Sequence, residues 1–213
     1  MSKILEIKNL CYQYPLANSG FSNLSFDLKL GEFKLLLGKN GSGKSTLINL
    51  ILGFRTPTSG EIKIENIPVR ELKPHETNRF FYLSQLIDFP RTLTLRTYLD
   101  MIALSYPNYS KHLEEQLIKI FQVEPSSTMH QLSLGQRVRI QIIAAFASRA
   151  PLIIIDEITA VLDEVARENF SVLMQKTLAT KKTAILMATN IAREISIPVT
   201  EIIQIDQEIP HAA

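Results

Sequence analysis

Apolar residues alternate with polar ones near the N-terminus of this chain and gather later into short continuous runs. The alternation at Ile4–Glu6, Ile7–Leu10 and Leu24–Leu28 predicts three short strands with one buried face. The later runs are almost wholly apolar and predict fully buried strands. They cover residues 33–37, 80–83, 152–155, 184–187 and 202–205.

Helical patterns separate these runs. A helix is expected from Lys44 to Gly53, because glycine commonly follows the last helical residue. A longer stretch, Leu95 to Val123, has helical spacing throughout and predicts a helical insertion between two segments of the sheet. Further helices are expected between Ser133 and Pro151 and from Glu164 onward. The chain is therefore predicted to fold as an α/β protein.

Composition narrows the setting. The chain has 213 residues, of which 46% are hydrophobic and 21% charged, as expected for a globular protein of one large domain. A net charge of +2 is too small to argue for nucleic acid or an anionic membrane surface as a partner. Cys11 is the single cysteine, so no internal disulfide forms and a reducing cytoplasm is the natural setting. No signal peptide or membrane-spanning run is recognisable.

The clearest chemical signal is Gly38–Ser45, which fits the P-loop pattern and lies between a predicted strand and a predicted helix. The backbone N–H groups of its glycines, together with the helix N-terminus, cradle phosphates. Lys44 reaches the β- and γ-phosphates, and the Ser45 hydroxyl binds Mg²⁺. The expected nucleotide-binding residues of this segment are Gly38, Asn40, Gly41, Ser42, Gly43, Lys44, Ser45 and Thr46.

Two acidic residues, Asp156 and Glu157, follow a buried strand. An acidic loop alone is common, but together with a P-loop it predicts the Walker B arrangement. Asp156 is then expected to hold Mg²⁺ through water, and Glu157 to orient or deprotonate the attacking water. ATP and Mg²⁺ are thus the predicted cofactors, and ATP hydrolysis is the predicted activity.

A second motif, Leu132–Gln136, lies well downstream of the P-loop and begins a predicted helix. Ser133 and Gln136 form a capping box, which is a complete structural explanation of both residues. The segment also resembles the signature of the ABC (ATP-binding cassette) family, with Ser133, Gly135 and Gln136 kept and Leu134 in place of a second glycine. The resemblance covers nearly the whole chain, from Tyr14 to Asn190, with the motifs in family order.

The resemblance implies the architecture. The fold would be a P-loop NTPase (RecA-like) core with an N-terminal antiparallel β subdomain and an inserted α-helical subdomain. All of 1–213 would form one ABC ATPase domain, in which 1–85 and 136–213 make the core with the β subdomain and 86–135 make the helical subdomain.

The resemblance also implies the function. The chain would be the ATPase subunit of a transporter, dimerising as a homodimer or heterodimer so that each ATP lies between the P-loop of one subunit and the signature of the other. The dimer would drive a separate transmembrane permease from the cytoplasmic face of the membrane.

Further residues match family positions. Gln85 resembles the Q-loop residue that senses Mg²⁺ and the attacking water, although a glutamine after a strand is also an ordinary loop residue. Tyr14 lies where the family stacks an aromatic ring on adenine, and Tyr12 is close enough to compete. Asp163 ends a segment that resembles the D-loop and is also a good helix N-cap.

Asn190 is the largest departure from the family pattern, which usually has a histidine that contacts the γ-phosphate. Asparagine carries no charge, so a deficit of about 1 kcal/mol and slowed hydrolysis are expected. The alternative is that Asn190 only caps a helix. In the loop after Asp156 and Glu157, this chain has Ile158 where the family usually has proline. The replacement is expected to alter the stiffness of that loop more than its chemistry.

The membrane partner is expected near the apolar segment 86–90 with Leu93, Leu95 and Tyr98, unless these side chains form the core of the helical insertion. The stretch Leu93–Leu99 resembles exporter-type cassettes, and no C-terminal regulatory domain is recognised, so export is favoured. Two alternatives remain: an ABC ATPase that does not serve transport, and a slow, nucleotide-gated regulatory subunit.

Overall fold

The computed structural model describes residues 2–15, 19–90, 92–190 and 197–205. Its strands form a four-stranded antiparallel sheet, ordered β2-β1-β4-β5, and a five-stranded parallel sheet, ordered β6-β7-β8-β3-β9. The antiparallel strands are β1 (Lys3–Gln13), β2 (Gly20–Lys29), β4 (Ser59–Ile64) and β5 (Ile67–Pro68). The parallel strands are β3 (Phe33–Leu37), β6 (Phe80–Ser84), β7 (Leu152–Asp156), β8 (Ala184–Thr189) and β9 (Glu201–Gln204). The predicted α/β class is confirmed.

The described residues contain five α-helices, and none of these is long and apolar enough to cross a membrane. They are α1 (Lys44–Ile51), α2 (Leu95–Ser105), α3 (Lys111–Phe121), α4 (Leu134–Ala147) and α5 (Glu164–Ala179). Short 3₁₀ turns occur at Val69–Glu71, Pro74–Arg79, Met129–Gln131 and Thr159–Val161.

One sequence expectation needs correction. Ile4–Glu6 and Ile7–Leu10 are not separate strands but parts of β1, whose pairing with β2 shifts register between Ile7 and Leu10. At that shift Lys8 and Asn9 are both exposed and Asn9 has a φ of 46°, so the bulge interrupts the alternation without ending the strand.

The helical stretch from Leu95 to Val123 is divided into α2 and α3. Tyr106 ends α2 with extended backbone, as the residue before a proline favours, and Pro107 follows it.

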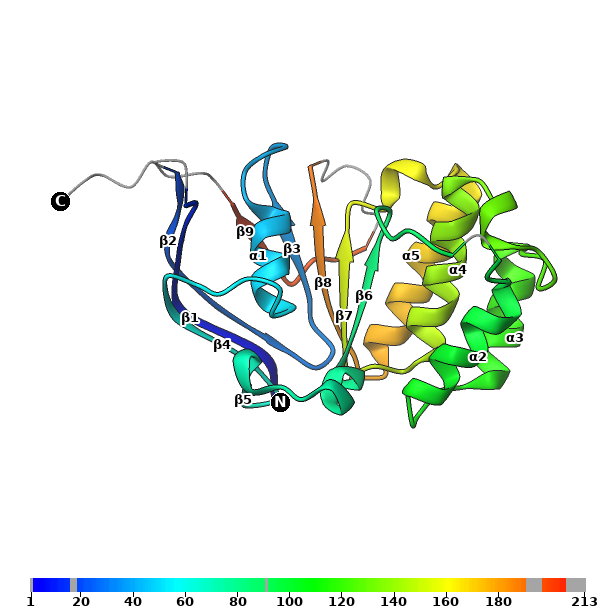
Figure 1. Cartoon of the computed structure of the whole chain (residues 1–213), viewed down its shortest axis with the longest axis horizontal. Helices are drawn as coiled ribbons and strands as arrows, with labels where there is room; N and C mark the ends of the chain where they lie inside the picture. Colours follow the sequence, from blue (N-terminus) through cyan, green and yellow to red (C-terminus); the bar gives the residue numbers. More distant parts are fainter. Residues whose placement is uncertain (1, 16–18, 91, 191–196, 206–213) are drawn as a thin grey trace.

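The elements are arranged in layers around the parallel sheet (Figure 1). Helix α1 lies between the two sheets, and one hydrophobic cluster joins α1, the antiparallel strands and the facing side of the parallel sheet. The opposite side of the parallel sheet packs against α4 and α5. This second cluster continues into α2 and α3, with Leu99 and Leu117 fully or almost fully buried, so the helical insertion shares its core with the sheet.

Two polar contacts hold strand β6 against the helices. The buried side chain of Gln141 on α4 accepts a hydrogen bond from the Ser84 N–H at the end of β6, at 3.2 Å. The Tyr106 hydroxyl, after α2, donates to the carbonyl of Phe80 at the start of β6, at 2.7 Å. The strand is therefore fixed at both ends by residues of the helical layer.

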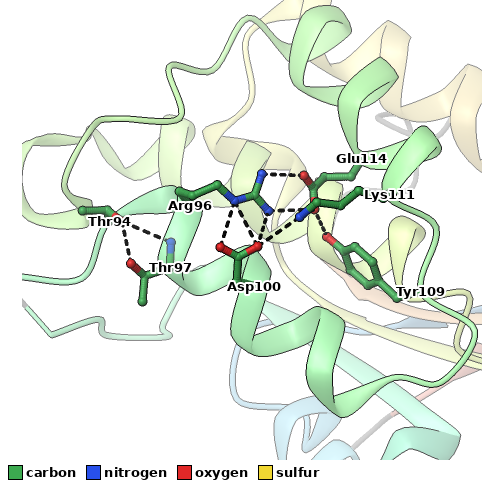
Figure 2. Close-up of polar contacts among 7 residues, drawn as sticks. All are labelled: Thr94, Arg96, Thr97, Asp100, Tyr109, Lys111 and Glu114. Atoms are coloured by element: carbon green, nitrogen blue, oxygen red, sulfur yellow. Dashed lines mark hydrogen bonds and ion pairs between the residues drawn. The ribbon is translucent and has the colours of Figure 1, made fainter.

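A buried carboxylate joins α2 and α3 within the helical insertion (Figure 2). Glu114 has no exposed side-chain surface and accepts hydrogen bonds from Arg96 at 2.7 and 3.1 Å, Tyr109 at 2.5 Å and Lys111 at 3.2 Å. The more exposed carboxylate of Asp100 also forms ion pairs with Arg96 and Lys111. Burial alone would raise the pKa of Glu114, but the hydrogen bonds from its partners outweigh burial and lower that pKa below 4.5.

We expect Glu114→Gln to reduce the free energy of unfolding by about 1.5–3 kcal/mol near neutral pH, because it removes hydrogen bonds to a charged group. Since folding lowers the pKa of Glu114, its contribution is fully present above about pH 4.5 and is lost as the pH falls through the lower folded pKa. Denaturant unfolding of both proteins at neutral and acid pH measures this difference.

The matched control is Asp100→Asn, which removes a carboxylate from the same network at a side chain that is 53% exposed. It should cost less than about 1 kcal/mol. Equal losses in the two variants, or a difference for Glu114→Gln that grows in acid, would contradict this account.

Candidate functional site

A pocket of ≈ 190 Å³ opens where β3 and β7 end and α1 begins. In Figure 1 this is the upper edge of the parallel sheet, where its strands have their carboxyl ends. Such an edge is where open α/β sheets bind ligands. The lining residues are Tyr14, Asn40, Gly41, Gly43, Lys44, Ser45, Thr46 and Glu157.

Lys44 is the central cation of the pocket. Its side chain is only 3% exposed, and its ammonium donates to the carbonyls of Gly38 at 2.8 Å and Lys39 at 3.1 Å. Its third contact is an ion pair with Glu157 at 3.3 Å. The P-loop is thus folded around the amine. Gly38 permits this tight path, because a Cβ there would lie 2.4 Å from both the carbonyl oxygen of Ile205 and the hydroxyl of Ser42.

The two acidic residues after β7 differ in surroundings. Asp156 is 5% exposed, whereas Glu157 is turned toward Lys44 by a left-handed backbone with a φ of 50°. Burial raises the pKa of Asp156, and the charge of Glu157 raises it further, while hydrogen bonds from Ser45 and Tyr82 and the charge of Lys44 lower it in part.

Two buried oxygens at this edge have no hydrogen-bond partner among the described residues. They are the Ser42 hydroxyl and Oδ1 of Asp156. Buried polar atoms are nearly always paired, so these two oxygens point to groups that a ligand supplies. A carboxylate that interacts with the Ser45 hydroxyl and keeps one oxygen unpaired suits Mg²⁺, which prefers oxygen ligands and is bound in proteins by one or two carboxylates together with phosphates. The residues present therefore fit a magnesium nucleotide.

The structure separates the two tyrosines that the sequence left in competition. Tyr14 lines the pocket, and its hydroxyl lies 2.6 Å from that of Thr46. Tyr12, in β1, is 8% exposed and accepts a hydrogen bond at 2.6 Å from Arg55, which lies between α1 and β4. Tyr14 is thus the residue available to a ligand.

Asn190 follows β8 directly and reaches the P-loop. Its amide nitrogen donates to the side-chain oxygen of Asn40 at 2.9 Å. Residues 191–196 lie outside the described residues, so the alternative role of Asn190 as a helix cap is not tested. The observed contact ties the end of β8 to the loop that surrounds Lys44.

The segment Leu132–Gln136 forms the predicted capping box at the start of α4. The Ser133 hydroxyl accepts from the N–H of Gln136 at 3.3 Å, and the Gln136 side chain accepts from the N–H of Ser133 at 2.9 Å. Gly135 lies against the turn before α5, where a Cβ would approach the Val161 carbonyl oxygen to 2.7 Å. This short contact explains why glycine stands at this position.

The family model described as "ABC transporter" matches residues 21–160, which is more than half of the chain. The chain belongs to the ABC transporter family. The predicted resemblance is therefore confirmed, and the match includes the P-loop, the capped segment and the acidic pair.

Named relatives share the cassette over most of its length. The ABC transporter ATP-binding protein YtrB of Bacillus subtilis is 26% identical over 84% of this chain. The molybdate import ATP-binding protein MolC of Haemophilus influenzae is 32% identical over 76% of it. The chain spans only 61% and 63% of the lengths of these two relatives.

Solved structures agree with the fold. The ATP-binding subunit of an ABC transporter superposes with a TM-score of 0.85 at 28% identity, covering 95% of this chain and 86% of the other. A dimeric, post-hydrolysis structure of the cassette MJ0796 of Methanocaldococcus jannaschii, bound to ADP and Pi, gives a TM-score of 0.77 at 25% identity and covers 96% of this chain and 97% of the other.

Not all expected site residues of the cassette meet in one place. Tyr14, Glu157 and six of the eight predicted P-loop residues line the pocket, whereas Gly38 and Ser42 lie outside its described lining. Asp156 and Asn190 contact residues that line it. Five others are absent from its described lining: Gln85 after β6, then Ser133, Gly135 and Gln136 at the start of α4, and finally Asp163. Asp163 caps α5 by accepting from the Ala166 N–H at 2.9 Å. Asp163 is also paired with Arg139 of α4.

The sequence reasoning missed two residues beside the site. The Tyr82 hydroxyl lies 3.4 Å from Oδ2 of Asp156, and Gln141 binds the backbone next to Gln85. Tyr82 lies within the otherwise apolar stretch Phe80–Leu83, and Gln141 lies directly between Ile140 and Ile142, and this was the signal available for finding them.

We expect Gly135→Ala to destabilise the cassette, because the new methyl group meets a backbone carbonyl that cannot rotate away. The steric cost of about 1–3 kcal/mol exceeds the gain of about 1 kcal/mol in helix propensity. Leu134→Ala is the control, since Leu134 is 43% exposed and its truncation should cost less than about 1 kcal/mol. Thermal unfolding measures both variants, and equal melting temperatures would show that the contact with Val161 is unimportant.

Proposed function

We propose that this chain is the motor subunit of an ABC transporter, which binds and hydrolyses ATP and drives a conformational change in a separate transmembrane partner. One observation carries the proposal. The described pocket has the P-loop and Glu157 in its lining, but no residue of the signature segment Leu132–Gln136. A second copy that brings its own signature to this edge completes the site, as expected from a family in which a dimeric cassette has been solved.

The P-loop side of the site binds the phosphates. Lys44 exchanges the Gly38 and Lys39 carbonyls and the Glu157 carboxylate for phosphate oxygens, which are stronger partners for a buried ammonium. The N–H groups at the start of α1 bind the same phosphates. Tyr14, at the edge of the pocket, stacks on the adenine ring.

Glu157 is the general base in this proposal. Once phosphate binds Lys44, the Glu157 carboxylate is released from its ion pair and faces the attacking water. Ser45 and Asp156 would hold a magnesium ion, with Gln85 as a sensor from the end of β6. When bound, that ion neutralises charge on the β- and γ-phosphates.

The partner subunit supplies Ser133, Gly135 and Gln136 across the dimer, where the N-terminus of α4 accepts the γ-phosphate. Within each subunit, Asp163 caps α5 and pairs with Arg139 of α4, so it links the start of α5 to the signature helix. Closure around two ATP molecules and opening after hydrolysis are the motion passed to the membrane subunit.

In this proposal the membrane subunit docks near the segment after Gln85. This docking would hold the chain at the cytoplasmic face of the membrane. Leu86 there is 82% exposed, although Leu95 is buried and Phe89 and Tyr98 pack against the helical core. Export remains the proposed direction on the motif Leu93–Leu99. The relative MolC is named for import, so a transport assay with the partner in vesicles decides the direction.

We expect Glu157→Gln to bind ATP but to hydrolyse it about 10²–10⁴ times more slowly, because the general base is lost. With magnesium and ATP the variant should accumulate as a dimer, measured by light scattering after size exclusion. The double variant Lys44→Ala, Glu157→Gln is the control and should remain monomeric. Normal hydrolysis by Glu157→Gln, or a monomer that persists with ATP and the membrane partner present, would overturn the proposal.

Asn190 sets the expected rate of hydrolysis. We expect Asn190→His to raise kcat by up to about tenfold, because a charged hydrogen bond to the γ-phosphate replaces a neutral one. Asn190→Ala, which removes the contact with Asn40 together with the proposed neutral hydrogen bond to the γ-phosphate, is the control and should hydrolyse no faster than the parent. Steady-state phosphate release measures all three proteins. An unchanged rate in Asn190→His would assign Asn190 to the local support of the P-loop, and negligible hydrolysis by the parent protein would favour the slow, nucleotide-gated regulatory subunit.

A further inference from the structure

Tyr82 lies in β6, next to the strand that carries Asp156. It is paired in register with Ile154, and residues two apart on a strand share a face. Tyr82 and Asp156 therefore extend from the same face of the parallel sheet, the one covered by α1. The tyrosine packs against the hydrophobic cluster under α1, so its ring has a fixed place below the carboxylate.

The two oxygens of Asp156 are used differently. Oδ2 lies 3.4 Å from the Tyr82 hydroxyl, which donates to it, whereas Oδ1 is buried without a hydrogen-bond partner among the described residues. A carboxylate can turn about its terminal bond through a broad range of angles. Holding one oxygen limits that rotation and leaves the other oxygen in a defined direction.

The backbone that carries Tyr82 is held as well. Gln141 binds the N–H of Ser84 at 3.2 Å, and the Tyr106 hydroxyl binds the carbonyl of Phe80 at 2.7 Å. Tyr82 lies midway between these two anchors. Groups that orient a metal ligand are effective when they are themselves held in place.

We propose that Tyr82 is a positioning residue, whose hydroxyl holds Oδ2 of Asp156 so that Oδ1 is directed to the magnesium ion of the nucleotide. The inference rests on the proposed function, because it takes Asp156 as the carboxylate that holds magnesium. Tyr82 touches neither the nucleotide nor the reacting water in this proposal, and it acts only through Asp156.

The test measures metal dependence apart from turnover. All variants are made in the Glu157→Gln background, and binding of a fluorescent ATP analogue is titrated with Mg²⁺. Tyr82→Phe removes a single oxygen atom and should raise the Mg²⁺ concentration for half-maximal enhancement by about tenfold, the lower end for loss of a group that orients a metal ligand. Binding of the analogue in EDTA should be unchanged, because the P-loop is untouched.

Tyr106→Phe is the matched control, since it removes a hydroxyl bound to the same strand but not to Asp156. It loosens only the backbone that carries Tyr82 and leaves the hydroxyl on Asp156 in place, so it should shift the Mg²⁺ dependence much less than Tyr82→Phe does. An equal shift in both variants, or no shift in Tyr82→Phe, would overturn the positioning role. Melting temperatures of the two variants establish that both are folded.

Asp156→Asn in the same titration separates the two levels of the proposal. If it abolishes the Mg²⁺ enhancement while Tyr82→Phe behaves like the parent, the magnesium site stands and the inference about Tyr82 fails. If Asp156→Asn leaves the enhancement intact, the assignment of Asp156 in the proposed function is wrong, and the inference falls with it.

Discussion

The burial of the Lys44 ammonium is the interaction on which the site depends. A cation that is 3% exposed must be paired, and its partners are two carbonyls of the preceding loop and the carboxylate of Glu157. These contacts bring the end of β3, the start of α1 and the loop after β7 to one place. The same contacts are exchangeable, because an arriving phosphate offers the amine more negative charge than a carbonyl does.

The second constraint is that several helices begin at the same edge of the parallel sheet, but a single pocket cannot use the starts of all of them. Helices α1, α4 and α5 all begin at the edge where the strands end (Figure 1). Of these three helices, α1 alone contributes its start to the described lining of the pocket. The starts of α4 and α5 are joined by the Gly135–Val161 contact and the Arg139–Asp163 pair, so they form a surface that is separate from the pocket.

Strand β6 connects the helical insertion to this chemistry. It is held by Gln141 from the signature helix and by Tyr106 from the end of α2, and it carries Tyr82 to Asp156 and Gln85 toward the insertion. The insertion itself has no independent core, since its apolar residues share a cluster with α4 and the sheet. A displacement of the helical layer therefore acts on β6 directly, through hydrogen bonds rather than through a flexible linker.

The local sequence determined the types of the elements, the phosphate chemistry of Gly38–Ser45 and the capping box at Ser133, because each depends on residues a few positions apart. It did not determine which groups meet across the fold. Tyr82 and Asp156 are 74 positions apart, and Asn190 and Asn40 are 150 apart, so no local pattern encodes either contact. The strand order of the parallel sheet and the packing of α1 and α4 brought these pairs together, and only the tertiary structure decided them.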